Sequence, residues 1–114
     1  MPKTVLSPTP RKERPNVLAL EGEIDLHVSP NVAQALQSMI DKKPRQLVVD
    51  LSRATYLDSS ALAVLIGGMQ NMDAYGGKFT LAGMNNDVRT IFEIARLDQV
   101  FRIFPDVDAA LAAV

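Results

Sequence analysis

The regular alternation of short strand-like runs with longer segments of helical periodicity constrains the fold more than any other feature. Four runs have the length and character of strands, at residues 17–20, 46–51, 79–82 and 101–104, and a helical segment follows each. Continuous apolar runs are typical of strands covered on both faces, and strands that alternate with helices favour parallel crossovers. The pattern predicts a single α/β domain with a mixed, mostly parallel sheet of four to five strands and four helices.

Capping residues mark the ends of the first two helices. Ser29 and the proline after it predict a helix start at which the serine hydroxyl accepts a hydrogen bond from a free amide. The second helix is predicted to begin after Asp58 and to run to about Tyr75, where Gly76 can supply a left-handed stop. Apolar residues recur in it at intervals of three and four, which places Leu65 in the core.

Two connections and two further helices complete the pattern. We expect residues 21–25 to leave the sheet after the first strand, and residues 52–57 to lead from the second strand into the second helix. Asn85 or Asn86 caps the third helix, and the fourth begins at residue 107. The predicted core stripe of the third helix consists of Val88, Ile91, Phe92 and Ala95.

The N-terminal segment differs in composition from the rest of the chain. Residues 1–15 contain four of the seven prolines, so we expect a poorly ordered segment or a short edge strand around residues 4–6. The basic cluster at residues 11–14 has no aromatic residues interleaved with it, which favours a solvated tail over a nucleic-acid patch. The folded domain is expected to span residues 16–114.

Composition excludes several classes of protein. The 114 residues suit one domain, and 12 basic against 13 acidic side chains give a net charge of −1, which would attract neither nucleic acid nor an anionic membrane. The absence of cysteine excludes disulfide scaffolds and thiol catalysis. The longest uncharged stretch is too short and too polar to insert in a membrane, and the N-terminus does not read as a secretory signal. We therefore expect a cytoplasmic protein.

The side chains that most enzymes need are missing. The single histidine, His27, is predicted to lie in a surface turn, so no nucleophile has an evident base beside it. Asp50 and Asp58 are eight residues apart and are interpreted as a solvated strand end and a helix cap. An enzyme that uses Asp58 and a serine has no base to support it. We expect no catalytic residues, no metal and no cofactor.

The stretch TYLDSSALAVLIGG, at residues 55–68, allows two interpretations. In the structural one, Asp58 caps the helix and the two serines occupy its first turn. In the functional one, Ser59 at the first helical position carries its hydroxyl at the end of a strand and outside the core, where a kinase can reach it. Physical arguments alone leave both open.

The chain from about Asn16 onward resembles the STAS domains of bacterial anti-sigma factor antagonists. The most specific features are the Asp-Ser-Ser at a strand-to-helix junction and the GEID of residues 22–25 upstream of it. The similar segments are EGEIDLHVSP at 21–30, QLVVDLSRATYLDSSALAVLIGGM at 46–69, GGKFTLAGMNNDVRTIFEIARL at 76–97 and FPDVDAALAAV at 104–114.

The resemblance implies a role for each residue of the motif. Ser59 matches the serine that a combined anti-sigma factor and serine kinase phosphorylates and that a metal-dependent Ser/Thr phosphatase restores. Asp58 matches the adjacent acid, and Asp25, Ser60 and Ala61 join it at the partner-binding surface. Family members commonly have glycines after the serines, whereas this chain has alanines, which bear on how closely a partner can approach Ala61.

The resemblance also implies partner switching. The unphosphorylated protein would bind the anti-sigma factor and free a sigma factor, and phosphorylation of Ser59 would end that binding. The alternative is a structural STAS subunit of an ABC-type lipid transporter, or a scaffold of a sensory complex, in which Ser59 need never be phosphorylated.

Overall fold

The computed structural model describes residues 9–113. In chain order its elements are β1 (Arg11–Arg14), β2 (Val17–Ile24), α1 (Ser29–Ile40), β3 (Gln46–Leu57), α2 (Ser59–Asp73), β4 (Lys78–Ala82), α3 (Asn86–Ile94), β5 (Arg102–Phe104) and α4 (Val107–Ala112). The strands form one sheet in the order β1-β2-β3-β4-β5, in which only β1 and β2 pair antiparallel. The predicted α/β fold with a mixed, mostly parallel sheet is confirmed.

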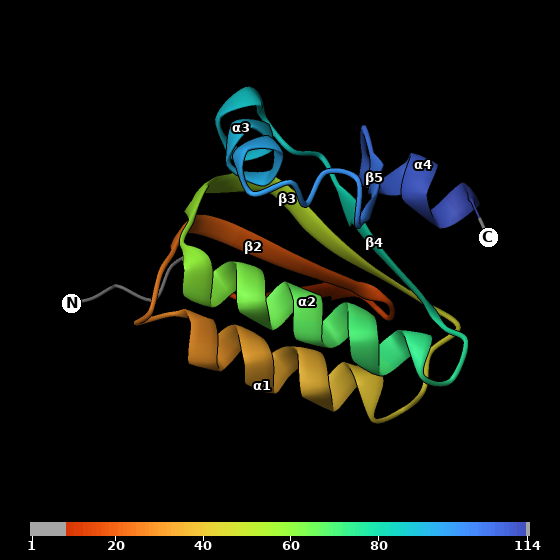
Figure 1. Cartoon of the computed structure of the whole chain (residues 1–114). Helices are drawn as coiled ribbons and strands as arrows, with labels where there is room; N and C mark the ends of the chain where they lie inside the picture. The colour runs from red at the N-terminus through yellow and green to blue at the C-terminus, as the bar shows by residue number, and fades with distance from the viewer. Residues whose placement is uncertain (1–8, 114) are drawn as a thin grey trace.

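The helices cover the two faces of the sheet in pairs. Figure 1 shows α1 and α2 side by side on one face, with α3 and α4 on the other. Successive residues of the central strand β3 serve the two faces in turn: Val49 belongs to the core shared with α1 and α2, and Val48 contacts the core that includes Ala110 of α4. Leu65 of α2 is 1% exposed, which confirms the core face predicted from its periodicity.

The paired strands β2 and β3 are longer than the sequence predicts. Residues 21–24 and 52–57 continue the two strands instead of leaving the sheet, and Ile24 pairs with Leu57 at the far end. Both of these side chains are buried, so extending the strands adds to the core although polar residues precede them. Gly22, with φ of +78°, lies beside a shift in the strand register.

The N-terminal edge of the sheet is β1, whose four residues are all exposed. The strand considered around residues 4–6 lies outside the described residues.

The ends of two helices can also be compared with the sequence predictions. Gly76 has φ of +85° and follows α2 as predicted, whereas Ala95 is exposed and not in the core, because α3 ends one residue before it.

Candidate functional site

The chain passes from β3 into α2 through Asp58, which caps the helix. Its backbone is extended (φ −92°, ψ −176°), and its carboxylate Oδ1 accepts a hydrogen bond from the amide of Ala61 at 3.1 Å. The amide of Asp58 donates to the carbonyl of Ile24 at 3.2 Å, so the junction is attached to the end of β2. The capping role predicted from the sequence is confirmed.

Ser59 is the first residue of α2, and it is exposed. The side-chain hydrogen bonds found at this junction within residues 9–113 use Asp58, Ser60 and Ser29, and none uses the hydroxyl of Ser59. Its hydroxyl therefore faces solvent and is free to react or to bind.

The neighbouring hydroxyl of Ser60 is engaged on both sides. It donates to Asp58 Oδ1 at 2.6 Å and accepts from Ser29 Oγ at 2.9 Å. The sequence predicts that Ser29 caps α1, but this prediction is wrong, because Ser29 is the first residue inside the helix and is 3% exposed. Since α1 and α2 lie side by side, its buried hydroxyl finds a partner across the helix pair and not in its own backbone.

Hydrogen bonding keeps Asp58 ionised. The Ser60 hydroxyl, followed by the amide of Ala61, lowers the pKa of the Asp58 carboxyl below its ordinary value of 3.8. A negative charge thus stands next to the free hydroxyl of Ser59 at neutral pH.

The loop after β2 lies beside this junction. Asp25 accepts a hydrogen bond from the amide of His27 at 3.0 Å through its carboxylate, and its carbonyl accepts from the amides of Val28 and Ser29. His27 is exposed in the turn, as predicted. Asp25 and Asp58 are therefore carried by adjacent connections at the same end of the sheet.

Ala61 is placed at the partner surface by the resemblance, but its side chain is 2% exposed and belongs to the core. Because position 61 is on the buried side of the first helical turn, a partner would meet Ser59 and the exposed Ala63 before it reached Ala61. The alanine therefore contributes to stability and not to surface chemistry.

Two exposed apolar side chains flank the junction and were not identified from the sequence. Leu26, in the loop after β2, is 68% exposed, and Tyr56, two residues before the cap, is 47% exposed. Single exposed apolar side chains are common on protein surfaces, but aromatic ones such as Tyr56 are enriched among the anchors of protein interfaces. The signal that could have located Leu26 is an apolar residue between two polar ones in a predicted turn.

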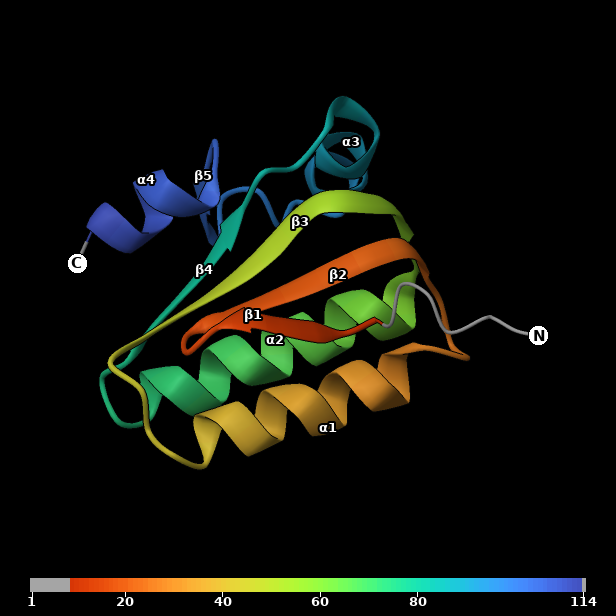
Figure 2. The same ribbon diagram turned by 180° about the vertical axis from the view of Figure 1, so that it is seen from behind.

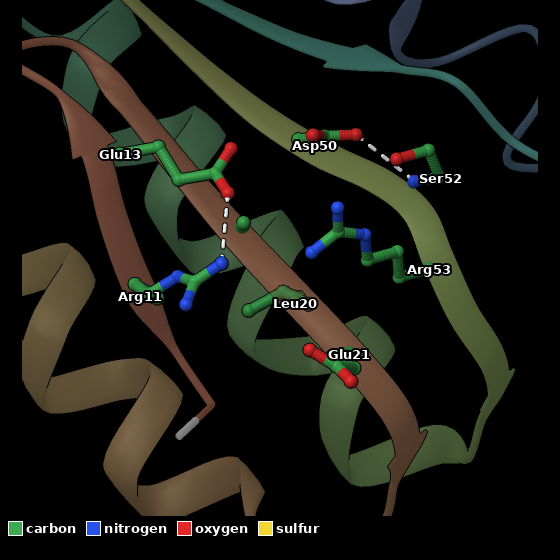
Figure 3. Close-up of a pocket in the computed structure, with 8 residues that line it drawn as sticks. Arg11, Glu13, Leu20, Glu21, Asp50, Ser52 and Arg53 are labelled. Atoms are coloured by element: carbon green, nitrogen blue, oxygen red, sulfur yellow. Dashed lines mark hydrogen bonds and ion pairs between the residues drawn. The ribbon is translucent and has the colours of Figure 1, made fainter. Parts of the chain in front are cut away.

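The face of the sheet away from α1 and α2 carries mixed charges around a shallow pocket. Figure 3 shows Arg11 and Glu13 of β1 joined at 3.2 Å, with Arg53 of β3 pointing toward them. The Asp50 carboxylate accepts from the amide of Ser52 at 3.0 Å. The cavity, about 60 Å³, is far below the ~300 Å³ at which small-molecule sites begin.

The two aspartates considered as a possible carboxylate pair lie far apart along β3. Asp50 and Asp58 are separated by eight residues, mostly of extended strand, or about 26 Å, so they do not act as an acid–base pair. Across residues 9–113, no three His, Cys, Asp or Glu side chains form a group that could hold a metal ion. None of the helices in the described part of the chain is long and apolar enough to cross a membrane.

Comparison with known proteins shows the family of this chain. A family model described as "STAS domain" matches residues 8–110. The chain belongs to the STAS domain family. The anti-sigma-F factor antagonist RsfB of Mycobacterium tuberculosis is 30% identical to this STAS domain over 98 residues, which is 86% of this chain and 80% of RsfB. The resemblance noted in the sequence is confirmed.

Solved structures of anti-sigma factor antagonists have the same fold as this chain. A crystal structure of an anti-sigma factor antagonist from Mycobacterium paratuberculosis is 31% identical, has a TM-score of 0.78, and is matched over 86% of this STAS domain and 83% of that chain. The Bacillus cell fate determinant SpoIIAA, solved in its phosphorylated form, shares the fold at 19% identity, with a TM-score of 0.69 over 91% of this chain and 96% of that one.

Proposed function

We propose that this STAS domain is an anti-sigma factor antagonist that phosphorylation of Ser59 switches off. It is a regulatory binding protein, and its partner is an anti-sigma factor. Two lines of support converge: relatives about 30% identical over most of the chain carry that name, and Ser59 has a free, exposed hydroxyl at the start of α2. The free hydroxyl is the observation that carries the proposal.

The partner would be both anti-sigma factor and serine kinase. In the transfer, Ser59 Oγ forms a bond to the γ-phosphorus of ATP, the bond to the ADP oxygen breaks, and the hydroxyl proton passes to a base on the kinase. A Ser/Thr phosphatase would restore the hydroxyl by hydrolysis. The kinase reaction uses ATP, and the sigma factor that the switch would free acts in transcription, so we place the protein in the cytoplasm.

The charge balance at the junction explains why the fold would survive phosphorylation. A phosphate adds ~1.5 to 2 negative charges at neutral pH. At an exposed helix N-terminus the helix dipole offsets part of this with ~0.3 to 1 kcal/mol. Asp58 repels the phosphate, but both groups are in contact with solvent.

Binding would not survive in the same way. A partner that covers Ser59 would have to bury the phosphate beside the ionised Asp58, and an unpaired charge inside an interface costs several kcal/mol, or about a thousandfold in affinity. Phosphorylation would therefore release the anti-sigma factor, which could then bind its sigma factor again.

The alternative, a STAS subunit of a lipid transporter or a scaffold, would use the same end of the domain as a permanent contact. It predicts no phosphorylation of Ser59, and the names of the curated relatives favour the antagonist. Peptide mapping by mass spectrometry, after incubation with ATP and the candidate kinase that copurifies with the protein, separates the two.

We expect phosphate on Ser59 alone, because the Ser60 hydroxyl is held between Ser29 and Asp58. A Ser59→Ala variant, which keeps the Ser60 hydroxyl, should take up none. Phosphate on Ser60 in the wild type, or copurification of a permease and a transport ATPase in place of a kinase, would refute the proposal.

A further inference from the structure

A second concave surface lies between the edge of the sheet and the outer flank of α1. Figure 2 shows β1 at the edge of the sheet, on the side where α1 lies. The cavity between them is about 330 Å³, within the range of small-molecule sites. It extends beyond the end of α1 to Lys42 and Pro44, and the first helix residue that lines it, Ala35, is six positions after Ser29, or ~9 Å along the helix axis. The groove is therefore separate from the Ser59 junction.

The walls of the groove are mainly apolar. On α1, positions 35, 38 and 39 follow the i, i+3, i+4 spacing of one helix face, and together with Lys42, just after the helix, they line the groove. This flank is distinct from the core stripe of Val32, Leu36 and Ile40. Leu18 of β2 and Pro10 and Pro15 beside β1 supply the facing wall. Proline has no amide to donate, so these walls offer few polar partners.

The charges in the groove are of one sign. Lys12 of β1 and Lys42 after α1 line it, and no aspartate or glutamate does. The ion pairs found in the described part of the chain join Arg11 to Glu13 and Arg14 to Asp108, so neither lysine is neutralised by a carboxylate there. Asp41, next to Lys42, accepts a hydrogen bond from Gln37.

We propose that this groove binds a single-chain fatty carboxylate. The hydrocarbon chain would lie along Leu18, Ala35 and Met39, where its removal from water provides the affinity. The carboxylate would accept hydrogen bonds from the ammonium groups of Lys12 and Lys42. A neutral or cationic amphiphile would leave both lysines without a partner, so the groove selects an anion.

A concave groove between a strand and a helix encloses one chain, whereas a bilayer needs a convex or flat apolar surface with basic residues around it. The net charge of −1 gives the chain as a whole no attraction to an anionic bilayer. These features favour a free carboxylate over a lipid membrane as the ligand.

The test is an NMR titration of the full-length protein with sodium octanoate and sodium decanoate below their micelle concentrations. We expect saturable shifts of the amides of Leu18, Ala35 and Met39, with decanoate binding more tightly than octanoate. Decanol and decyltrimethylammonium, which match the chain but not the charge, should bind at least about tenfold more weakly, the effect of losing one charge-assisted hydrogen bond.

Paired variants separate the groove from general effects of charge and size. Lys42→Glu should weaken decanoate binding by about tenfold or more, whereas Lys43→Glu, the same change at a neighbour that does not line the groove, should stay within about threefold of wild type. Met39→Trp should block the groove. Met69→Trp, at a half-buried methionine of α2, should bind normally.

Three results would overturn the proposal: shifts that do not saturate, equal binding of decanol and decanoate, or equal losses in Lys42→Glu and Lys43→Glu. Sedimentation of the protein with vesicles of anionic phospholipid is a further measurement, which tests binding to a membrane. Binding to vesicles without binding to free decanoate would assign the lysines to a membrane surface and reject the fatty carboxylate. None of these outcomes depends on the function of Ser59.

Discussion

Ser29 and Ser60, which are 31 residues apart in the chain, share a hydrogen bond of 2.9 Å that joins the first turns of α1 and α2. Because the Ser60 hydroxyl in turn donates a hydrogen bond to Asp58 Oδ1, the two helices and the cap form one connected set of bonds. The hydroxyl of Ser59, between Asp58 and Ser60 in sequence, is left outside this set. The arrangement makes chemically different sites of two adjacent serines.

A negative charge at position 59 should abolish binding to the anti-sigma factor without unfolding the domain. Ser59→Asp adds a charge that the start of α2 tolerates and that a covering partner does not. Ser59→Ala should bind as wild type does. Titration calorimetry and circular dichroism melts of the same preparations measure both effects.

Asn71→Asp is the matched control for this prediction, since it adds one negative charge at an exposed position on α2, 12 residues or ~18 Å from Ser59. It should bind normally. If Ser59→Asp binds within about threefold of wild type, a difference of ~0.7 kcal/mol, phosphorylation is not an interface switch.

Leu26 and Tyr56 should anchor the partner. Truncation of either to alanine removes an exposed apolar side chain beside Ser59, and we expect each to weaken binding by ~1 to 2 kcal/mol, or about five- to thirtyfold. Val100→Ala provides the comparison, because Val100 is 49% exposed and lies in a groove with Met69 and Asp73, toward the opposite end of α2. Equal losses in all three variants would mean that the partner does not dock at the Ser59 end.

Leu65→Ala should lower the free energy of unfolding by ~2 to 5 kcal/mol, because the side chain is buried in the core and leaves a cavity. Leu26→Ala, the same substitution at an exposed site, should change it by less than about 0.5 kcal/mol. Urea melts followed by circular dichroism give both values. Similar losses for the two leucines would contradict the assignment of the buried face of α2.

The pKa of Asp58 should depend on Ser60 and not on Ser59. Since the pKa is lowered in the folded state, the bonds to Asp58 stabilise the fold fully above the ordinary value of 3.8, and this contribution is lost as the pH falls through the lowered pKa. Ser60→Ala removes the largest cause, so the pKa should rise toward 3.8. Ser59→Ala should leave it low. An NMR titration that follows the carboxyl carbon of Asp58 measures this pKa in both variants. An unchanged pKa in Ser60→Ala would show that the Ser60 hydroxyl does not stabilise the ionised carboxylate.

The sequence by itself determined the order of the elements from β2 onward and the cap at Asp58, because these depend on periodicity and on bonds between residues three apart. It did not predict β1, since residues 11–14 look like a solvated tail until they pair with β2. Burial of Leu65 followed from the same local spacing. Strand length did not, since residues 21–24 and 52–57 look polar in isolation and become strand only when Ile24 and Leu57 pair over a shared core.

Only the tertiary structure decided the chemistry of the serines. Ser29 looks like a cap in the sequence, because the local residues do not show which helix will lie beside it. In the folded domain α1 packs against α2, and the Ser29 hydroxyl donates its hydrogen bond to Ser60. The groove between β1 and α1 arises in the same way, since its two lysines are 30 residues apart and line one cavity only in the folded domain. Local patterns specify elements, while contacts between distant residues determine which polar groups are satisfied and which remain free.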